Sequence, residues 1–229
     1  MREIVLDTET TGFKPEDGHR VVEIGCVELF NHLPTGQTRQ WYLNPEREVP
    51  EDAVRVHGLT TAFLADKPLF RDIAGGFLDF IADAPLIAHN AAFDIAFLDA
   101  ELQRLDPVRR PLPLATNRQI IDTVQLARQK FPGAGASLDA LCKRFGIDNS
   151  GRSLHGALLD STLLAEVYLE LLGGRQTGFA LAAPGAALRS AARAARTARP
   201  PRPHAPSPEE LEAHAALLKK LKGPLWVLP

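Results

Sequence analysis

Three strand-type segments in succession open the chain, and they constrain the fold more than any other feature of the 229-residue sequence. They are the apolar run EIVLD, the β-branched run RVVEIGCVELF and the run QTRQWYLNP, at residues 3–7, 20–30 and 37–45. The turn-rich stretch NHLPTG joins the second run to the third. Three strands joined in this way predict an antiparallel meander.

From residue 70 onward, segments of helical and strand type alternate. Helical periodicity over residues 70–84 is followed by a buried-strand run, PLIAHN, and then by an amphipathic helix over residues 94–106. Residues 118–124 predict a fifth strand that leads into another helix. The apolar side of the 94–106 helix carries Ile95, Leu98, Leu102 and Leu105.

Two more helices complete this part of the chain. SLDALCKRFGI has Ser137 as a suitable N-cap and ends at Gly146, whereas GALLDSTLLAEVYLELLGG is long and ends at Gly173 and Gly174. Antiparallel strands followed by strands interleaved with helices predict an α/β domain with a mixed five-stranded sheet flanked by helices. We expect this domain to span residues 1–174.

Composition is that of an ordinary globular protein, with 45% hydrophobic and 24% charged residues. Charges at Arg2, Glu3, Asp7 and Glu9 interrupt any apolar leader, and no apolar run approaches the ~20 residues of a membrane span. We therefore expect a cytoplasmic protein with no membrane contact. The two cysteines, Cys26 and Cys142, lie in apolar stretches and favour reduced core thiols over a disulfide, which the sequence leaves open.

The last quarter of the chain differs in charge from the rest. Residues 1–173 hold 17 basic and 25 acidic side chains, a net of −8, whereas residues 174–229 hold nine and three, a net of +6. No acid occurs from Gly174 to Pro208, where Ala, Arg, Pro and Gly dominate, so residues 175–207 are expected to form a flexible linker. Its arginines fit either a solubilising tether or a basic contact with nucleic acid.

Residues 208–229 regain a helical pattern. Ser207 can cap a helix that begins at Pro208, and its acids precede its lysines as the helix dipole favours. The apolar end PLWVLP cannot bury itself in so short a segment. Docking on a partner and packing on the chain's own domain are the two alternatives.

The acidic residues that could form a site stand out by their positions in the sequence and not by their number. In IVLDTETTG, Asp7 and Glu9 lie two residues apart on a strand, so both side chains project from one face. Two neighbouring carboxylates repel each other unless a cation lies between them, and Mg²⁺ prefers oxygen ligands. The alternative is a solvated pair of acids.

Two further acids follow strands or open helices. Asp94, in LIAHNAAFDIAFL, comes after a buried strand, where sites of α/β proteins assemble, although it could be a simple N-terminal helix acid. Asp160 lies near the border of the apolar side of the long last helix. His155, five residues earlier, fits the same site if it lies on the preceding loop and Gly156 permits a bend.

The ordered set of four acids and one histidine resembles the DnaQ-like, or DEDDh, family of 3′→5′ exonucleases, and within it the proofreading subunits of bacterial DNA polymerase III. The resemblance covers residues 1–173 and implies a ribonuclease H-like exonuclease fold followed by an extended C-terminal tail. It runs through the motifs LDTETTG, EIG, VHGL, HNAAFDIAFL, SLDALC, IDNSGRSLHGALLD and LAEVYL.

This resemblance implies chemistry with two divalent ions, Mg²⁺ or Mn²⁺. Asp7 would bridge the ions, Glu9, Asp94 and Asp160 would complete the protein ligands, and His155 would act as the general base. The products would be deoxynucleoside 5′-monophosphates. The residues beside the terminal nucleotide would be Asp7, Glu9, Asp160, Asp52, His57, Thr8 and Thr10.

The resemblance also implies partners. These are the 3′ end of single-stranded DNA, a sliding clamp at QTGFAL (176–181) and the catalytic alpha subunit of the polymerase at residues 208–229, with room for a small accessory subunit. Two alternatives stay open: a stand-alone RNA-trimming exonuclease, and a binding module that braces the polymerase and clamp. An acidic body at −8 predicts few phosphate contacts with DNA.

Overall fold

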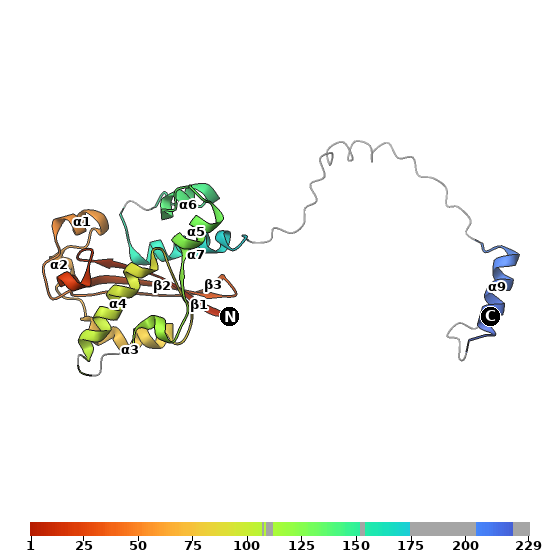
Figure 1. The fold of residues 1–229 in the computed structure, drawn as a ribbon, viewed down its shortest axis with the longest axis horizontal. Coiled ribbons are helices and arrows are strands. Elements are labelled where there is room, and N and C mark those ends of the chain that lie inside the picture. Colours follow the sequence, from red (N-terminus) through yellow and green to blue (C-terminus); the bar gives the residue numbers. More distant parts are fainter. Residues whose placement is uncertain (107, 109–111, 152–153, 175–204, 222–229) are drawn as a thin grey trace. The chain divides into compact units, whose positions relative to one another are not determined.

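One five-stranded sheet, with strand order β3-β2-β1-β4-β5, organises the N-terminal part of the chain in the computed structural model (Figure 1). The structure describes residues 1–106, 108, 112–151, 154–174 and 205–221. The chain divides into two units, residues 1–178 and 179–229. The element described in the second unit is α9 (Pro208–Leu218).

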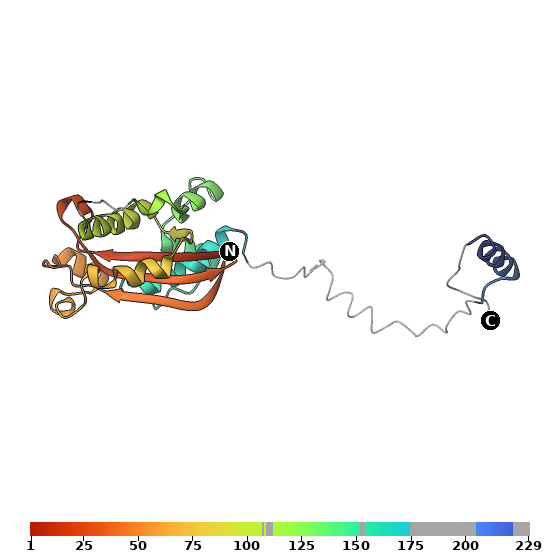
Figure 2. The same ribbon diagram turned by 90° about the horizontal axis from the view of Figure 1, so that it is seen from below.

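Strands β1 (Arg2–Thr10), β2 (Val21–Phe30) and β3 (Leu33–Tyr42) form the predicted antiparallel meander. They run side by side in both views (Figures 1 and 2). Two short strands, β4 (Leu86–Ala88) and β5 (Ile120–Asp122), extend the sheet in parallel with β1. The prediction of a mixed five-stranded sheet is confirmed.

The hairpin between β2 and β3 is tighter than the sequence suggests. The third strand begins at Leu33 rather than at residue 37, because only Asn31 and His32 form the turn. Both have positive φ, 50° and 66°, as the type I′ form of a two-residue hairpin turn requires. Much of the turn-rich stretch NHLPTG is therefore strand.

Helices occupy the remaining segments. Two of them, α1 (Glu51–His57) and α2 (Thr61–Leu64), are not anticipated by the sequence pattern, and α4 (Ala91–Leu105) begins three residues earlier than expected. Leu105, which the sequence places on the apolar side of this helix, is its last residue and is 42% exposed, whereas Ile95, Leu98 and Leu102 are buried. The helices are α1 (Glu51–His57), α2 (Thr61–Leu64), α3 (Phe70–Ile81), α4 (Ala91–Leu105), α5 (Thr123–Lys130), α6 (Leu138–Phe145) and α7 (Ala157–Leu171), with short 3₁₀ turns at Pro15–Asp17 and Leu114–Thr116.

Side chains alternate between the two faces of the sheet, and each face has its own core. Ile4 and Leu6 of β1 pack with α3 and α4, whereas Val5 packs with α5, α6 and α7. The two cysteines lie in different cores, Cys26 with α3 and α4 and Cys142 with α6 and α7, and neither forms a disulfide. The expectation of reduced, buried thiols is confirmed.

The helix caps predicted from the sequence are present. The Ser137 side chain accepts from the Ala140 N–H, and Gly146 ends α6 in the left-handed conformation with φ of 70°. Ser207 forms a capping box with Glu210 at the start of α9, with Pro208 in the first turn. Of the helices in the described ranges, none combines the length and apolarity needed to span a bilayer. Residues 175–204 of the expected 175–207 linker, which include the QTGFAL segment, and the end of the chain from residue 222 lie outside the described residues.

Candidate active site

The C-terminal half of β1 carries the first two acids. Since Val5 faces the core formed with α7, the alternation of a strand places Asp7 and Glu9 on that same face. Asp7 lies opposite Gly25 of β2, and Glu9 lies opposite Glu23. Asp7 is half-buried, and Glu9 is 8% exposed. The two carboxylates therefore project toward α7 from neighbouring positions.

The first turn of α7 packs directly on Gly25. A Cβ added at Gly25 would lie 2.2 Å from the carbonyl carbon of Ala157 and 2.3 Å from the Leu158 nitrogen, so only glycine permits this approach. The Ser161 hydroxyl donates to the Gly25 carbonyl over 3.1 Å and holds the second turn against the strand. The sequence motif EIG thereby places the start of α7 beside Asp7.

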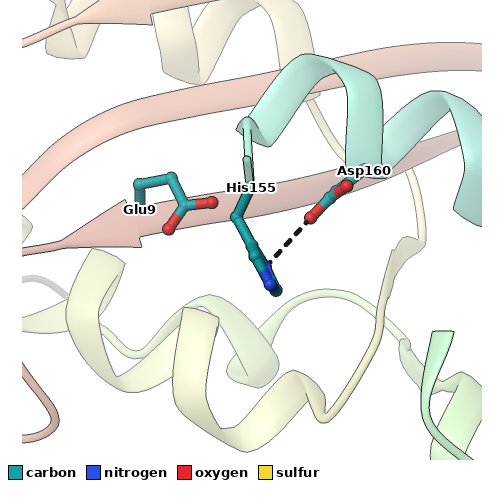
Figure 3. Close-up of side chains that lie close together, drawn as sticks. All are labelled: Glu9, His155 and Asp160. Carbon is teal, nitrogen blue, oxygen red and sulfur yellow. Dashed lines mark ion pairs between the residues drawn. The ribbon is translucent and has the colours of Figure 1, made fainter. Parts of the chain in front are cut away.

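This packing brings three predicted site residues together. Ligand atoms of Glu9, His155 and Asp160 all lie within 4.8 Å of one another (Figure 3). Asp160 is 3% exposed, on the buried side of α7. The structure thus joins two segments that are almost 150 residues apart in the sequence.

His155 lies on the loop directly before α7. Its Nδ1 is 3.5 Å from Asp160 Oδ2, and its side chain is 48% exposed. Its backbone N–H donates to the Val56 carbonyl over 3.0 Å, so the end of α1 holds the loop. Gly156 has φ of −153°, an extended conformation open to any residue, so the bend before α7 does not depend on a glycine conformation.

Asp94 is the third acid of the set and lies in the first turn of α4. Its Oδ1 accepts from both the backbone N–H and the hydroxyl of Thr8, over 3.0 and 2.7 Å. It is 2% exposed, and burial raises its pKa to about 7 although the Thr8 donors oppose the shift. Asp7 and Asp94 are not among the three residues whose ligand atoms lie within 4.8 Å of one another. Asp94 is nevertheless bonded to Thr8, the residue between Asp7 and Glu9 on β1.

A cavity of about 350 Å³ opens beside Glu9. Predicted substrate residues Thr10, Asp52 and His57 line it, but Thr8 is not among the lining residues. The Thr10 hydroxyl donates to the Gly12 carbonyl over 2.6 Å. Asp52 is exposed and paired with Arg55.

His57 presents a buried ring to this cavity. It is 5% exposed, and its Nδ1 accepts from the Leu59 N–H over 3.0 Å, which assigns the proton to Nε2. Nε2 has no hydrogen-bond partner among the described residues. Burial lowers the pKa of His57, opposed by the Thr10 backbone, and keeps the ring neutral at pH 7. The neutral, buried ring therefore forms part of the cavity wall.

Sequence reasoning missed the apolar part of the cavity, formed by Ala53 and Val56 of α1, by Phe13 and by Phe93. Phe13 is 87% exposed, which is unusual for an aromatic side chain. Phe93 directly precedes Asp94 in the sequence, which is the signal that could have marked it. Such a mixture of apolar walls and few polar groups is typical of small-ligand sites.

The donor set fits divalent cations. Carboxylate oxygens are the ligands that Mg²⁺ and Mn²⁺ prefer, and an imidazole can accompany them. Glu9, Asp94 and Asp160 are each at least 92% buried, and buried carboxylates close together are unfavourable unless cations compensate them.

Comparison with known proteins gives a consistent result. A family model described as Exonuclease matches residues 4–168. A protein named DNA polymerase III subunit epsilon from Rickettsia conorii is 49% identical over 224 residues, or 96% of each chain. One of the same name from Rickettsia felis is 57% identical over 179 residues, covering 78% of this chain and 77% of that one. A solved structure of exonuclease X in complex with 5′ overhanging duplex DNA is 26% identical, with a TM-score of 0.58 over 74% of this chain and 90% of that chain.

Proposed function

Because the chain belongs to the RNase T exonuclease family, we propose that it is the proofreading 3′→5′ exonuclease subunit of a bacterial DNA polymerase III. Membership makes the chain a metal-dependent hydrolase of phosphodiester bonds, and its sheet and helices form the ribonuclease H-like exonuclease fold that the sequence predicts. The observation that carries the proposal is the meeting of Glu9, His155 and Asp160 beside a cavity.

Asp7, Glu9, Asp94 and Asp160 would hold two divalent cations, with Asp7 as the shared ligand. When bound, such cations provide Lewis acidity toward the phosphate and make a water molecule easier to deprotonate. His155 would act as the general base, since imidazole changes protonation near neutral pH. With Nδ1 turned toward Asp160, Nε2 is the atom that would take the proton.

The cavity beside Glu9 would receive the 3′-terminal nucleotide. Its apolar walls suit a base, and the neutral ring of His57 would form part of the wall beside the nucleotide. Thr10 and Asp52 line the same cavity, with Asp52 at an exposed position. Both donors of Thr8 are bonded to Asp94, so Thr8 would contribute by holding that ligand.

Selection for mismatches would follow from the size of this site rather than from base readout. A mispaired terminus separates from its template more readily, so a site that accepts single strands meets it more often. The net charge of −8 over residues 1–173 disfavours broad contact with the phosphate backbone. Efficient action on long DNA would then require delivery by a partner.

The tail would provide that delivery. We propose residues 1–174 as the exonuclease domain, 175–207 as a linker with a clamp-binding segment at 176–181, and 208–229 as the segment that docks on the alpha subunit. The similarity to the Rickettsia conorii protein extends over 96% of the chain and so includes the tail. A tether raises the effective concentration of the exonuclease at the polymerase. This role would place the protein in the cytoplasm, with or without a small accessory subunit.

Digestion of end-labelled oligonucleotides tests the proposal. With Mg²⁺ or Mn²⁺ present, single-stranded DNA should lose 5′-mononucleotides stepwise from its 3′ end, and EDTA should stop the reaction. A parallel RNA substrate separates DNA proofreading from RNA trimming. Faster digestion of RNA, or removal from the 5′ end, would contradict the proposal.

A further inference from the structure

Helix α7 lacks an N-terminal cap of its own. Gly156 occupies the N-cap position and provides no side-chain hydrogen bond. The first N–H groups of any helix have no partner within the helix and need acceptors from elsewhere. In α7 this turn leads to Asp160 and directly follows His155, so its position sets the geometry of the site.

Glu23 of β2 lies where such an acceptor is needed. It is two residues from Gly25 and projects from the same face of the strand, the face on which the first turn of α7 packs. The backbone N–H groups of Ala157 and Leu158 face the Glu23 carboxyl and act to lower its pKa. An acid at a helix N-terminus is also favoured by the helix dipole.

The neighbouring strand fixes the Glu23 side chain from the other side. Gln40 of β3 donates its amide N–H to Glu23 Oε1 over 2.7 Å and also contacts the Tyr42 hydroxyl over 2.9 Å. Glu23 is only 2% exposed, and burial raises its pKa while Gln40 and the two backbone donors oppose the shift. The surroundings therefore hold an acceptor oxygen in place at the start of α7.

We propose that Glu23 is a positioning residue that caps α7 from the neighbouring strand and thereby sets Asp160 and His155 against Glu9. The inference rests on the proposed function, because it concerns the placement of that site. Glu23, the acid of the EIG motif, would then affect the reaction through the position of α7, without contacting the substrate.

A second buried glutamate has a structural role only and provides a comparison for Glu23. Glu101 of α4 is also 2% exposed, but Arg20 binds it over 2.7 and 2.9 Å, and it lies on the core face opposite to α7. Its loss would weaken the fold without moving the start of α7. Glu101→Gln is therefore the matched control for Glu23.

The test compares full-length Glu23→Ala, Glu23→Gln and Glu101→Gln with the wild type. Hydrogen exchange, followed by NMR, reports on the Ala157 and Leu158 amides, and steady-state digestion of single-stranded DNA gives kcat and KM. For Glu23→Ala we expect lost protection of both amides and a kcat about 10- to 100-fold lower, because small displacements of catalytic groups have effects of this size. KM should change by less than about twofold, since the nucleotide cavity is untouched.

Glu23→Gln keeps one acceptor oxygen, so it should recover most of the lost rate and part of the protection. Should Glu23→Ala fail to fold, a kcat in Glu23→Gln at least about threefold lower, with KM unchanged, supports the inference. Glu101→Gln should lower the melting temperature and leave kcat and the two amides unchanged. Wild-type kcat and protection in both Glu23 variants would overturn the inference, whereas an inactive wild type would overturn the proposed function instead.

Discussion

Thr8 donates both its backbone N–H and its hydroxyl to one oxygen of Asp94, over 3.0 and 2.7 Å. Strand β4 pairs with β1 only at Ile4 and Val5, so β1 runs on beyond its parallel neighbour. Asp94 replaces that neighbour as the acceptor for the Thr8 N–H. The third acid is thus held to the segment of β1 that carries the first two.

Asp94 should make the metal-free protein less stable as pH rises. Burial raises its pKa to about 7, above the value of about 4 in an unfolded chain. Between pH 4 and 7 the folded state keeps a proton that the unfolded state has lost, so the free energy of unfolding falls through this window. Asparagine keeps an oxygen for both Thr8 donors and carries no charge. In EDTA, urea unfolding should show Asp94→Asn more stable than the wild type at pH 8 and equal to it near pH 4.

Metal provides the control for this prediction. Addition of Mg²⁺ at pH 8 should stabilise the wild type more than Asp94→Asn, and Asp94→Asn should lose digestion of DNA. Parallel pH curves for the two proteins in EDTA would show that Asp94 is not the titrating group.

Gly25→Ala should disable the site while the sheet survives. The new methyl group would lie 2.2–2.3 Å from backbone atoms of Ala157 and Leu158, so the start of α7 must move away from β2. We expect a kcat about 100-fold lower, since Asp160 and His155 move with that turn. Steady-state digestion and circular dichroism measure the two effects.

Gly76→Ala is the matched control for Gly25→Ala. Nothing lies within 4 Å of a Cβ at Gly76, in the middle of α3, and alanine favours a helix by about 0.5–1 kcal/mol. This variant should be more stable than the wild type and fully active. An active Gly25→Ala protein would contradict the placement of α7.

The sequence predicts those parts of the fold that depend on local pattern. The meander, the parallel strands and the caps at Ser137 and Ser207 follow from alternation, apolar runs and capping chemistry. Helix α1 is missed because its seven residues are too few to show a period, and it is exposed over much of its length. The early start of β3 is missed because the positive φ of Asn31 and His32 allows a turn shorter than composition suggests.

The sequence predicts which residues form the candidate site, but not the contacts that hold them in place. The acids stand out because charged residues interrupt apolar segments, whereas His155 stands out only through its place five residues before Asp160. The roles of Gly25, Ser161 and Thr8 depend on contacts between segments up to 136 residues apart, which no local pattern encodes. Glu23 is visible in the sequence as an acid within a β-branched run, but only the packing of α7 shows that it lies at the start of that helix.

Asp7→Ala should abolish digestion without unfolding the protein. The side chain is half-buried at the end of β1 and is proposed as the shared metal ligand. We expect a rate at least about 1,000-fold lower, with unchanged circular dichroism. Asp79→Ala, at an exposed position of α3, is the control and should keep full activity. Metal-dependent digestion by Asp7→Ala would show that the site lies elsewhere.

Removal of residues 208–229 should separate assembly from chemistry. The truncated chain should digest short single-stranded DNA at the wild-type rate, because the site lies within residues 7–160. It should no longer bind the alpha subunit in a pull-down, since the docking segment is absent. A chain cut after residue 174, which lacks the arginines of the linker, should show a salt dependence of DNA binding that corresponds to roughly three phosphate contacts or fewer. Retained binding to the alpha subunit would place the docking surface on another part of the chain.

Anomalous scattering from a crystal soaked in MnCl₂ tests the central claim most directly. We expect two manganese peaks, about 3.5–4 Å apart, with Asp7 between them and oxygens of Glu9, Asp94 and Asp160 as the other protein ligands. His155 should lie beside the pair without binding either ion. Manganese bound at other acids, with these four carboxylates unliganded, would contradict the account.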